Sequence, residues 1–302
     1  MSDGGPLSDG GVSALLARCT FPPAGSAVDC AVSGGPDSLA LLVLAVEAGL
    51  AVTAWHVDHG LRPESAGEAA LVVRTAAELG AAAHRVEAPV ADGPNLEARA
   101  RDARRDVLPP GVLTGHTADD QAETVLMNLL RGSGVPGAAG IGEPERRPLL
   151  ALRRSETRAL CAARALTPAH DPMNDDPRFL RTRVRHEVLP LLAEVSGRDP
   201  VPILARHAEL AREAVGLLAG LVADVDATDV KALTLLPDDL VRLALRAWLT
   251  DRASGLPPDS ASVDRVLEVV DLHEQRGQVV ARLSGGQRGR VGLALALLGR
   301  PE

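Results

Sequence analysis

A glycine-rich turn between a predicted strand and a predicted helix is the feature that most restricts the fold of this chain. The apolar segment 27–32 leads into Ser33-Gly34-Gly35-Pro36-Asp37-Ser38, and a second apolar segment follows over 39–46. A turn of this kind points backbone N–H groups and the positive end of a helix dipole at one place, where an anion binds. The pattern therefore predicts a phosphate-binding loop, although six residues alone also fit a simple tight turn.

The residue types of this loop suit a nucleotide. Gly34 and Gly35 are expected to allow close approach of the backbone and to adopt positive φ, and Ser33 and Ser38 offer hydroxyls to phosphate oxygens. Asp37 would repel phosphate unless it holds a Mg²⁺ ion that bridges to the phosphates. The predicted nucleotide-binding residues of the loop are Ser33, Gly34, Gly35, Pro36, Asp37 and Ser38, and the predicted metal ligand is Asp37.

The loop differs from the common phosphate-binding loop of ATPases and GTPases, which places a lysine on the terminal phosphates. The one lysine of this chain is Lys231, far from the loop in sequence. A glycine loop without that lysine suits binding of the pyrophosphate portion of ATP in an enzyme that attacks the α-phosphate.

Short apolar segments alternate with helical patterns through the first half of the chain. Predicted strands over 51–57, 83–86 and 112–114 follow the first one, with helices over 65–79, 96–107 and 119–130 between and after them. This order predicts an α/β fold, a parallel sheet with helices on both faces, in which ligands bind beyond the carboxyl ends of the strands. The segment 132–148, with five glycines and three prolines, is predicted to be a long, mobile loop.

A second, smaller and mainly helical domain is predicted after residue 195, with helices over 203–224, 238–249 and 262–272. The predicted organisation is a flexible N-terminus over 1–24, the α/β domain over 25–195 and the helical domain over 196–302.

Composition limits the class of protein. Cys19, Cys30 and Cys161 form neither a close pair nor a metal-binding spacing, which is typical of a reduced cytosolic protein. No signal peptide and no apolar run of membrane length is found, so we expect a soluble, cytoplasmic protein without a membrane partner. The net charge of −8 argues mildly against binding of nucleic acid.

The charge is unevenly distributed. The segment 131–190 contains 11 Arg against 7 Asp and Glu, a balance of +4, so the rest carries −12. A basic segment can hold a phosphate backbone because the local field matters more than the total charge. A solvated arginine-rich surface is the alternative.

Two further motifs follow predicted strands. In Val57-Asp58-His59-Gly60-Leu61-Arg62, the side chains of His59 and Arg62 are placed to touch a nucleotide; the alternative is a plain strand-to-helix connection. In the segment 115–124, Asp120 and Glu123 are three residues apart, so both carboxylates project from one helical face. They suit a metal or a cationic amine, or serve only the helix dipole. His116 is a candidate polar contact to substrate or phosphate.

The Ser-Gly-Gly-x-Asp-Ser loop resembles the pyrophosphatase loop of N-type ATP-pyrophosphatases, the PP-loop superfamily. Within that group, several segments over residues 25–192 resemble the tRNA(Ile)-lysidine synthase family. They are the motif around Asp58, the Asp-Asp-Gln-Ala-Glu-Thr block, Leu129 to Gly134, Arg147 to Leu150, His170 to Asp176, Arg181 to Arg185 and Val188 to Pro190.

The resemblance implies an ATP-dependent ligase that forms a carbon–nitrogen bond. The C2 oxygen of the wobble cytidine of tRNA(Ile) with a CAU anticodon would attack the α-phosphate of ATP, pyrophosphate would leave, and the ε-amine of L-lysine would displace AMP. The implied catalytic residues are Asp37, His116, Asp120 and Glu123, with Mg²⁺ at Asp37 and the lysine ammonium at Asp120 and Glu123. The implied tRNA contacts are Arg147, Arg181, Arg183 and Arg185, the helical domain would bind tRNA, and a homodimer is an open expectation.

The chain departs from the family pattern at Thr117, where a second histidine is usual, near Arg105, where an aromatic is usual, and at Thr182, which replaces Asn. Alternatives are a tRNA thiolase with the same loop, which would need reactive cysteines, and a non-catalytic ATP-binding module. Leu283-Ser284-Gly285-Gly286-Gln287-Arg288 resembles the signature of ATP-binding-cassette ATPases, but without a lysine-bearing phosphate loop it is interpreted as a glycine turn.

Overall fold

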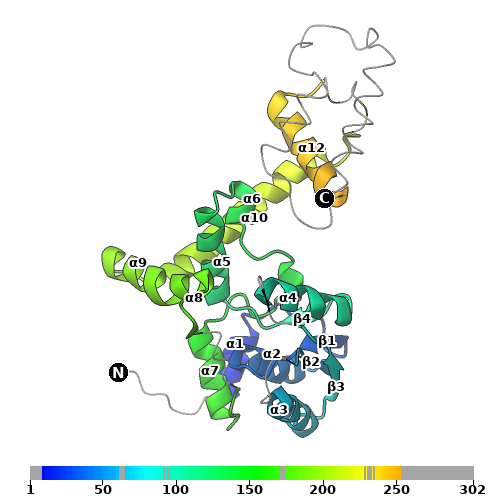
Figure 1. Ribbon diagram of the computed structural model, residues 1–302, viewed down its shortest axis with the longest axis vertical. Helices are drawn as coiled ribbons and strands as arrows, with labels where there is room; N and C mark the ends of the chain where they lie inside the picture. Colours follow the sequence, from blue (N-terminus) through cyan, green and yellow to red (C-terminus); the bar gives the residue numbers. More distant parts are fainter. Residues whose placement is uncertain are drawn as a thin grey trace. The chain divides into compact units, whose positions relative to one another are not determined.

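A computed structural model describes residues 9–60, 65–90, 93, 96–169, 175–227, 229, 233 and 235–252. The chain divides into two units, residues 1–211 and 212–302. Its elements (Figure 1) are α1 (Asp9–Leu16), β1 (Ala27–Ala31), α2 (Pro36–Glu47), β2 (Ala51–Asp58), α3 (Ser65–Glu78), β3 (Ala82–Glu87), α4 (Leu96–Val107), β4 (Leu113–Thr114), α5 (Ala118–Leu130), α6 (Val135–Ala138), η1 (Pro144–Arg146), α7 (Arg154–Ala163), α8 (Leu180–Arg183), η3 (Val184–Val188), α9 (Leu189–Ser196), α10 (Pro200–Val222) and α12 (Asp238–Arg252).

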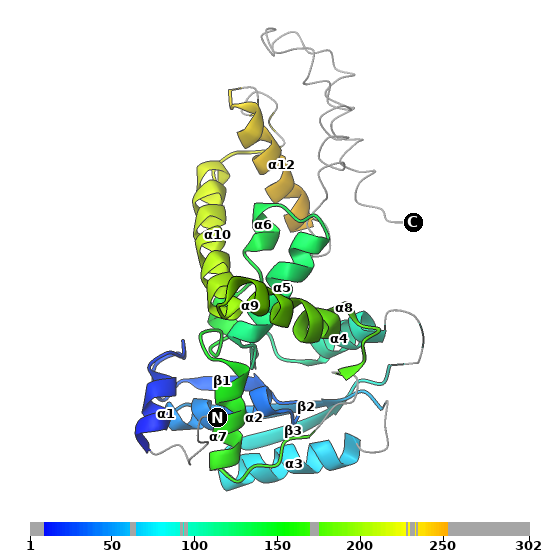
Figure 2. The ribbon, with the colours of Figure 1, turned by 90° about the vertical axis from the view of Figure 1, so that its left-hand side faces the viewer.

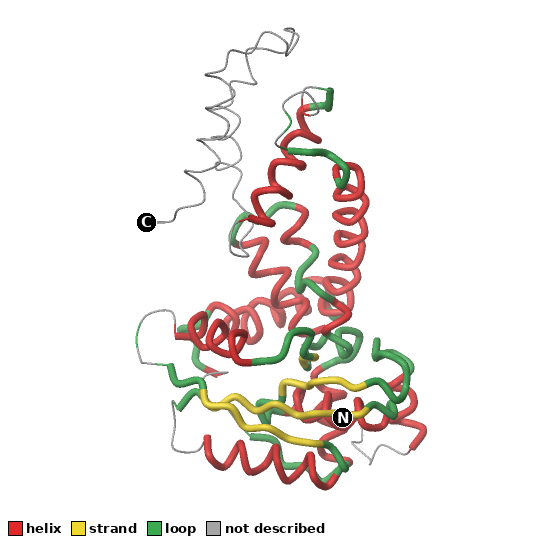
Figure 3. Tube along the Cα trace, turned by 90° about the vertical axis from the view of Figure 1, so that its right-hand side faces the viewer, coloured by secondary structure: helices red, strands yellow, loops and turns green. Residues whose placement is uncertain are grey.

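The first unit contains a sheet of four parallel strands in the order β3-β2-β1-β4. In register, Ala27 lies opposite Ala51, Thr53 opposite Ala82 and Cys30 opposite Leu113. Helix α3 lies on one side of the sheet and α4 on the other (Figure 2), so the strands form a layer between helices (Figure 3). The predicted α/β fold with a parallel sheet is confirmed.

Helix α2 lies at the centre of the core of the first unit. Every residue from Ser38 to Ala45 is buried, because α2 packs on β1 and β2 on one side and on α7 on the other. The core is built from aliphatic side chains, with Leu39, Leu41 and Leu42 fully buried. In β2, residues alternate between buried and partly exposed, the pattern of a strand with one face on a core.

The strand order sets the place of the site. From β1 the chain crosses to β2 on one side, whereas β4 joins β1 on the other side. The loops that follow β1 and β4 therefore both lie at the carboxyl ends of neighbouring strands, the position where ligands bind in open α/β sheets. The glycine loop 33–38 follows β1, and Gly115 and His116 follow β4.

The N-terminal segment contains a helix that was not predicted. Residues 1–24 were expected to be flexible, but residues 9–16 form α1, and Val12 and Leu15 are buried in the core of the first unit. These two residues are three apart and share a helical face. The glycine-rich, polar composition of the first eleven residues conceals this short amphipathic helix.

The segment 132–148 is not without secondary structure. It contains α6 and η1, and side chains of α5 tie it down: Asn128 donates to the Gly137 carbonyl (2.9 Å), and Gln121 accepts from the Ile141 N–H (2.7 Å). A plain loop is therefore the wrong description of this segment.

The helical run from α8 to α9 is continuous through η3, a π-helical turn. Pro190 lies at the start of α9 and has no N–H to donate to the preceding turn, which accounts for the irregular hydrogen bonding there. The predicted domain boundary near residue 195 falls within α9, in the first unit, whereas the two units separate after Ala211, inside α10.

The described part of the second unit is helical. The end of α10 and α12 share an apolar core that includes Val222, Leu233 and Leu245. The predicted helix over 262–272 and the turn Leu283–Arg288 lie outside the described residues. Among the helices described, none is both long and apolar enough to cross a membrane.

Candidate functional site

The glycine loop leads directly from β1 into the first turn of α2. Gly34 has φ +90°, as expected, and its backbone carbonyl accepts from the N–H of Ala169 (2.9 Å). The expectation of positive φ at Gly35 was wrong: Gly35 is extended (φ −72°, ψ 163°) as the N-cap of α2, with Pro36 at the first helical position. One left-handed residue is enough to turn the chain, and proline is well suited to a helix start because that position needs no N–H donor.

The two loop serines bond to each other and to the loop backbone. The Ser38 hydroxyl donates to the Gly35 carbonyl (2.9 Å), the Ser33 N–H donates to the Ser38 hydroxyl oxygen (3.2 Å), and the two hydroxyl oxygens are 3.2 Å apart. Both hydroxyls therefore lie at the N-terminus of α2, where the helix dipole favours an anion.

Gly115, after β4, lies against the same turn. A Cβ atom at this position would lie 2.4 Å from the carbonyl oxygen of Asp37. The loop after β4 is therefore in close contact with the first turn of α2.

Asp37 lies in the first turn of α2 and contacts α7. One carboxylate oxygen accepts a short hydrogen bond from the Thr157 hydroxyl, and the other lies 3.5 Å from Nε of Arg154. Burial raises the pKa of Asp37, while the Thr157 hydrogen bond opposes this shift. No group of three or more metal-ligating side chains occurs among the described residues. A single carboxylate beside a glycine loop at a helix N-terminus nevertheless fits Mg²⁺, which is usually held by one or two carboxylates together with substrate phosphates.

The motif after β2 is described only in part. His59 Nδ1 lies 3.0 Å from the Ala88 carbonyl, and Asp58 is paired with Arg85 (2.8 Å), so these side chains fix the end of β2 against β3. Arg62 lies outside the described residues, and its predicted nucleotide contact stays a prediction, as does that of His59.

His116 lies where β4 ends and is predominantly neutral near pH 7. Its Nδ1 is 2.8 Å from the Thr114 hydroxyl. Burial, supported by the positive charges of Arg147 and Arg181, lowers the pKa of His116 to about 4, although Asp120 opposes this shift. A neutral imidazole can accept a proton or a hydrogen bond.

Asp120 and Glu123 lie together in the first turns of α5, as predicted, and both are ion-paired with arginines. Glu123 is fully buried and accepts from Arg154 (2.9 Å), Arg181 (2.8 Å) and Arg185 (2.7 Å). Asp120 accepts from Arg154 (2.8 Å) and lies 3.6 Å from Arg181. We call this group the carboxylate–arginine cluster; its members are Asp37, Asp120, Glu123, Arg154, Arg181 and Arg185.

The arginines keep both carboxylates of α5 ionised. Burial alone would raise the pKa of Asp120, but Arg154 and Arg181 lower it to about 2. The pKa of Glu123 is likewise lowered despite burial, mainly through its hydrogen bond to Arg185. Thr117, which departs from the family pattern, is buried, and its N–H and its hydroxyl both donate to Asp120 (2.8 Å each). Thr117 therefore helps to orient Asp120.

The arginines predicted to contact tRNA lie in different surroundings. Arg181 and Arg185 point inward to Glu123, and Arg147 is largely buried, with a 3.2 Å contact to the Arg146 carbonyl. Arg183 is exposed and pairs with Glu187 one turn away (2.9 Å). Arg178 precedes α8 and pairs with Asp176 (2.6 Å), so it does not share a helical face with Arg181 and Arg185.

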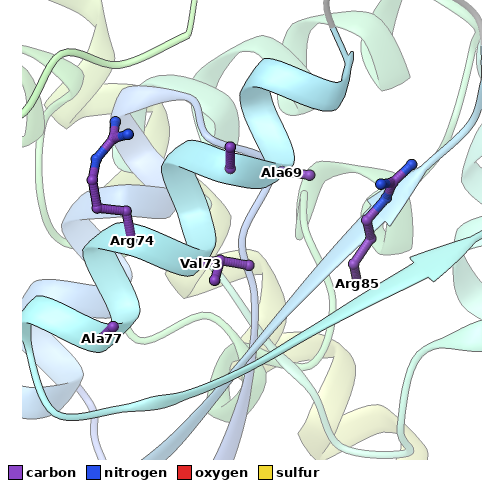
Figure 4. A pocket seen from close by; sticks show the side chains of 6 residues that line it. Ala69, Val73, Arg74, Ala77 and Arg85 are labelled. Atoms are coloured by element: carbon purple, nitrogen blue, oxygen red, sulfur yellow. The ribbon is translucent and has the colours of Figure 1, made fainter.

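Hollows on the described surface include two that differ in their relation to the site. One of about 230 Å³ adjoins the carboxylate–arginine cluster and is lined by Glu123, Arg154 and Arg185, with an apolar wall that includes Leu189 and Val201. The other, of about 420 Å³, is open and lies along α3, between Arg74 of α3 and Arg85 of β3 (Figure 4). Three of its six lining residues are alanines, and it contains none of the predicted site residues.

Sequence reasoning missed Arg154 and Thr157. They are three residues apart at the start of α7 and therefore share a face, but Thr157 and Asp37 are 120 residues apart in sequence. The three-residue spacing of Arg154 and Thr157 could have identified the shared helical face, whereas no feature of the neighbouring sequence identifies Asp37 as the partner of that face.

Comparison with known proteins gives a consistent result. A family model described as a PP-loop domain matches residues 13–192. The tRNA(Ile)-lysidine synthase of Nocardia farcinica is 43% identical over 287 residues, 89% of each chain, and that of Mycolicibacterium paratuberculosis is 46% identical over 242 residues, 75% of each chain.

Among solved structures, the U34-tRNA thiolase NcsA from Methanococcus maripaludis, with its [4Fe-4S] cluster, aligns with a TM-score of 0.54 at 20% identity, covering 67% of this chain and 78% of that one. This likeness concerns the fold alone. The extent of the family match and of the sequence identity shows more: the chain belongs to the tRNA(Ile)-lysidine synthase family, with its PP-loop domain over residues 13–192.

Proposed function

We propose that this protein ligates L-lysine to C2 of the wobble cytidine of tRNA(Ile) with a CAU anticodon, with ATP as the source of energy. The cytidine C2 oxygen attacks the α-phosphate and releases pyrophosphate; the lysine ε-amine then attacks C2, loses a proton and displaces AMP. The observation that carries the proposal is the close approach of the glycine loop, after β1, to the α5 carboxylates, after β4, in a member of this family.

For the first step, the loop residues Ser33 to Ser38 would hold the phosphates at the N-terminus of α2. Asp37 would hold Mg²⁺, which neutralises charge that develops on the phosphates. Neutral His116 would accept a hydrogen bond or proton at the substrate. The contacts of His59 and Arg62 with the nucleotide belong to the same proposal.

For the second step, Asp120 and Glu123 would receive the lysine ammonium. The 230 Å³ hollow supports this assignment for Glu123, which lines it together with other charged groups and an apolar wall for a methylene chain; Asp120 is not among its lining residues. Both oxygens of Glu123 already accept from guanidinium groups, so the ammonium must replace one of these donors to reach it. We expect Asp120→Asn to raise the lysine requirement more than the ATP requirement.

For tRNA, we propose phosphate contacts by Arg147, Arg181, Arg183 and Arg185. Arg183 is best placed, since its side chain is 57% exposed and its one ion pair found in the structure is with an exposed partner. A tRNA-binding role of the helical second unit, a cytoplasmic location and a homodimer remain part of this proposal.

A thiolase is the less favoured alternative. Burial raises the pKa of Cys19 and Cys30 to about 12 and that of Cys161 to about 11, whereas reactive cysteines have lowered pKa values. A non-catalytic ATP-binding module would bind ATP without releasing pyrophosphate, so an assay of pyrophosphate release distinguishes it from the ligase.

The test is incubation with ATP, Mg²⁺, L-lysine and unmodified tRNA(Ile) bearing CAU, followed by mass analysis of the nucleosides. We expect lysidine with the wild type. Without lysine, we expect pyrophosphate release and adenylated tRNA. Asp37→Asn, which keeps the size of the side chain, should nearly abolish pyrophosphate release. Wild-type enzyme that forms no lysidine with this tRNA would contradict the proposal.

A further inference from the structure

We propose that Arg154 is a positioning residue for both steps of the reaction. It would hold Asp37 of the nucleotide loop and the two α5 carboxylates, Asp120 and Glu123, in one fixed arrangement. The inference rests on the proposed function, because it assigns Arg154 a part in that reaction.

The contacts of Arg154 span both halves of the site. Its Nη1 lies 2.9 Å from Glu123, its Nη2 lies 2.8 Å from Asp120, and its Nε lies 3.5 Å from Asp37. Within the described residues, it is the arginine for which ion pairs with all three carboxylates are found. Arg181 and Arg185 reach the α5 carboxylates from α8 and η3.

The shape of the guanidinium explains why an arginine is needed there. Its five N–H donors lie in one plane in fixed directions, so three of its nitrogens address three carboxylates at once. A lysine ammonium at the same place is a point charge on a flexible stem and cannot keep all three carboxylates at these separations. Arg154 is only 12% exposed, so water does not substitute for these contacts.

The backbone of α7 keeps Arg154 in place. The Arg154 N–H donates to Asp119 of α5 (2.8 Å). One turn later, the Thr157 hydroxyl lies within hydrogen-bond distance of Asp37 and of the Arg154 carbonyl (2.9 Å to the carbonyl), and its single proton is donated to one of these two acceptors at a time. After a further turn, Cys161 Sγ lies 3.4 Å from the Pro36 carbonyl. One face of α7 is thus fixed to the start of α2 and to α5 together.

The charges of the carboxylate–arginine cluster balance: Asp37, Asp120 and Glu123 face Arg154, Arg181 and Arg185. Removal of one buried partner leaves an uncompensated carboxylate, which destabilises a protein for reasons unrelated to catalysis. A variant that keeps the positive charge but lacks the planar guanidinium therefore distinguishes the positioning of the carboxylates from the neutralisation of their charge.

Arg154→Lys is that variant, and Arg164→Lys is its matched control. Arg164 follows the last residue of α7, and its ion pair is with Glu47 of α2, which is not a member of the cluster. We would measure single-turnover pyrophosphate release without lysine and, separately, lysidine formation from tRNA that the wild-type enzyme has already adenylated. Arg154→Gln is a second variant, and thermal unfolding of each protein is recorded.

We expect Arg154→Lys to lower both rate constants roughly 10- to 100-fold at saturating substrates, since small displacements of reacting groups have effects of this size. The KM values for ATP and lysine should change less than the rates, and Arg164→Lys should stay within about threefold of wild type in both steps.

Three outcomes would overturn the inference. One is that Arg154→Lys keeps both rates near wild type; a second is that it impairs one step only, which would place Arg154 in one half of the site. The third is a lower fraction of active or folded enzyme with unchanged rate constants, which would make the role structural. If Arg154→Gln does not fold, the lysine variant carries the test. Failure of the wild type to form lysidine would contradict the proposed function before any variant is compared.

Discussion

Gly115 lies so close to the first turn of α2 that a side chain cannot be accommodated without movement. An added Cβ atom would lie 2.4 Å from the Asp37 carbonyl oxygen and 3.1 Å from the Ser38 nitrogen. Both neighbours are backbone atoms of a helix in the centre of the core, so the loops must separate instead.

We therefore expect Gly115→Ala to slow pyrophosphate release by roughly 10- to 100-fold, because it displaces Asp37 from the place at which we propose that it holds Mg²⁺ beside the nucleotide. Gly67→Ala in α3 is the control, since a Cβ atom there meets nothing within 4 Å. Steady-state release of pyrophosphate in the presence of tRNA is the measurement. Equal activity of the two variants would show that the two loops can separate without cost.

We expect acid pH to destabilise the folded protein through His116. The pKa of His116 is lowered to about 4 from an ordinary value of 6.5, so the unfolded chain binds a proton there at a higher pH than the folded protein does. This group therefore favours unfolding increasingly as the pH falls from 6.5 to 4, and not above 6.5. At pH 5 the effect amounts to about 2 kcal/mol.

His116→Asn removes this titration. Between pH 7.5 and pH 5, the free energy of unfolding of the wild type should fall by about 2 kcal/mol more than that of the variant. Urea denaturation at both pH values measures the difference, and comparing the change with pH within each protein removes any constant effect of the substitution. Parallel pH dependence in the two proteins would show that His116 protonates freely in the folded state.

At the scale of elements, α1 offers a direct test of the correction at the N-terminus. Leu15 is buried against the core of the first unit, and removal of a buried leucine side chain costs about 2–5 kcal/mol. Leu15→Ala should lower the free energy of unfolding by that amount. Ala14→Ser, on the exposed side of α1, is the control. A change no larger than the control's would mean that the N-terminal segment is flexible after all.

The elements themselves could largely be predicted from the sequence, because their signals are local. The turn at 33–38 marked the start of α2, and the short apolar run over 51–57 identified β2. The departures have physical causes. Helix α1 has only eight residues and one apolar face. The helical run continues through Pro190 because the π-helical turn before it accommodates the hydrogen bond that proline cannot donate.

The pairing of charged groups could not be predicted in this way. Asp120 and Glu123 were expected on one face and lie there, but their arginine partners come from 31 to 62 residues further along the chain. Sequence spacing places a side chain on a face of a helix and does not say which distant element covers that face. Arg181 and Arg185 illustrate the point: they were predicted as tRNA contacts, and they hold Glu123.

At the scale of the whole molecule, the uneven charge suggests how an acidic protein approaches tRNA. The chain carries −8 overall, yet the segment 131–190 carries +4. Part of that positive charge is used inside the carboxylate–arginine cluster. Neutralising Arg181 and Arg185 would remove two of the arginine partners of the buried Glu123 carboxylate and destabilise the protein, so these residues are poor probes of tRNA binding.

Arg183 is a better probe. Its side chain is 57% exposed, and its pair with the exposed Glu187 contributes little to stability, so Arg183→Gln should unfold like the wild type. If Arg183 contacts one phosphate, the variant should bind tRNA more weakly, and the slope of log K against log[KCl] should fall by about 0.7–0.9. Arg74→Gln is the control, because Arg74 is an exposed arginine of α3, outside the basic segment (Figure 4). Binding is measured over a series of potassium chloride concentrations. Equal slopes for the wild type and both variants would exclude Arg183 from the tRNA contacts. An equal fall of the slope in both variants would show that the effect comes from the net charge of the protein and not from a contact of Arg183.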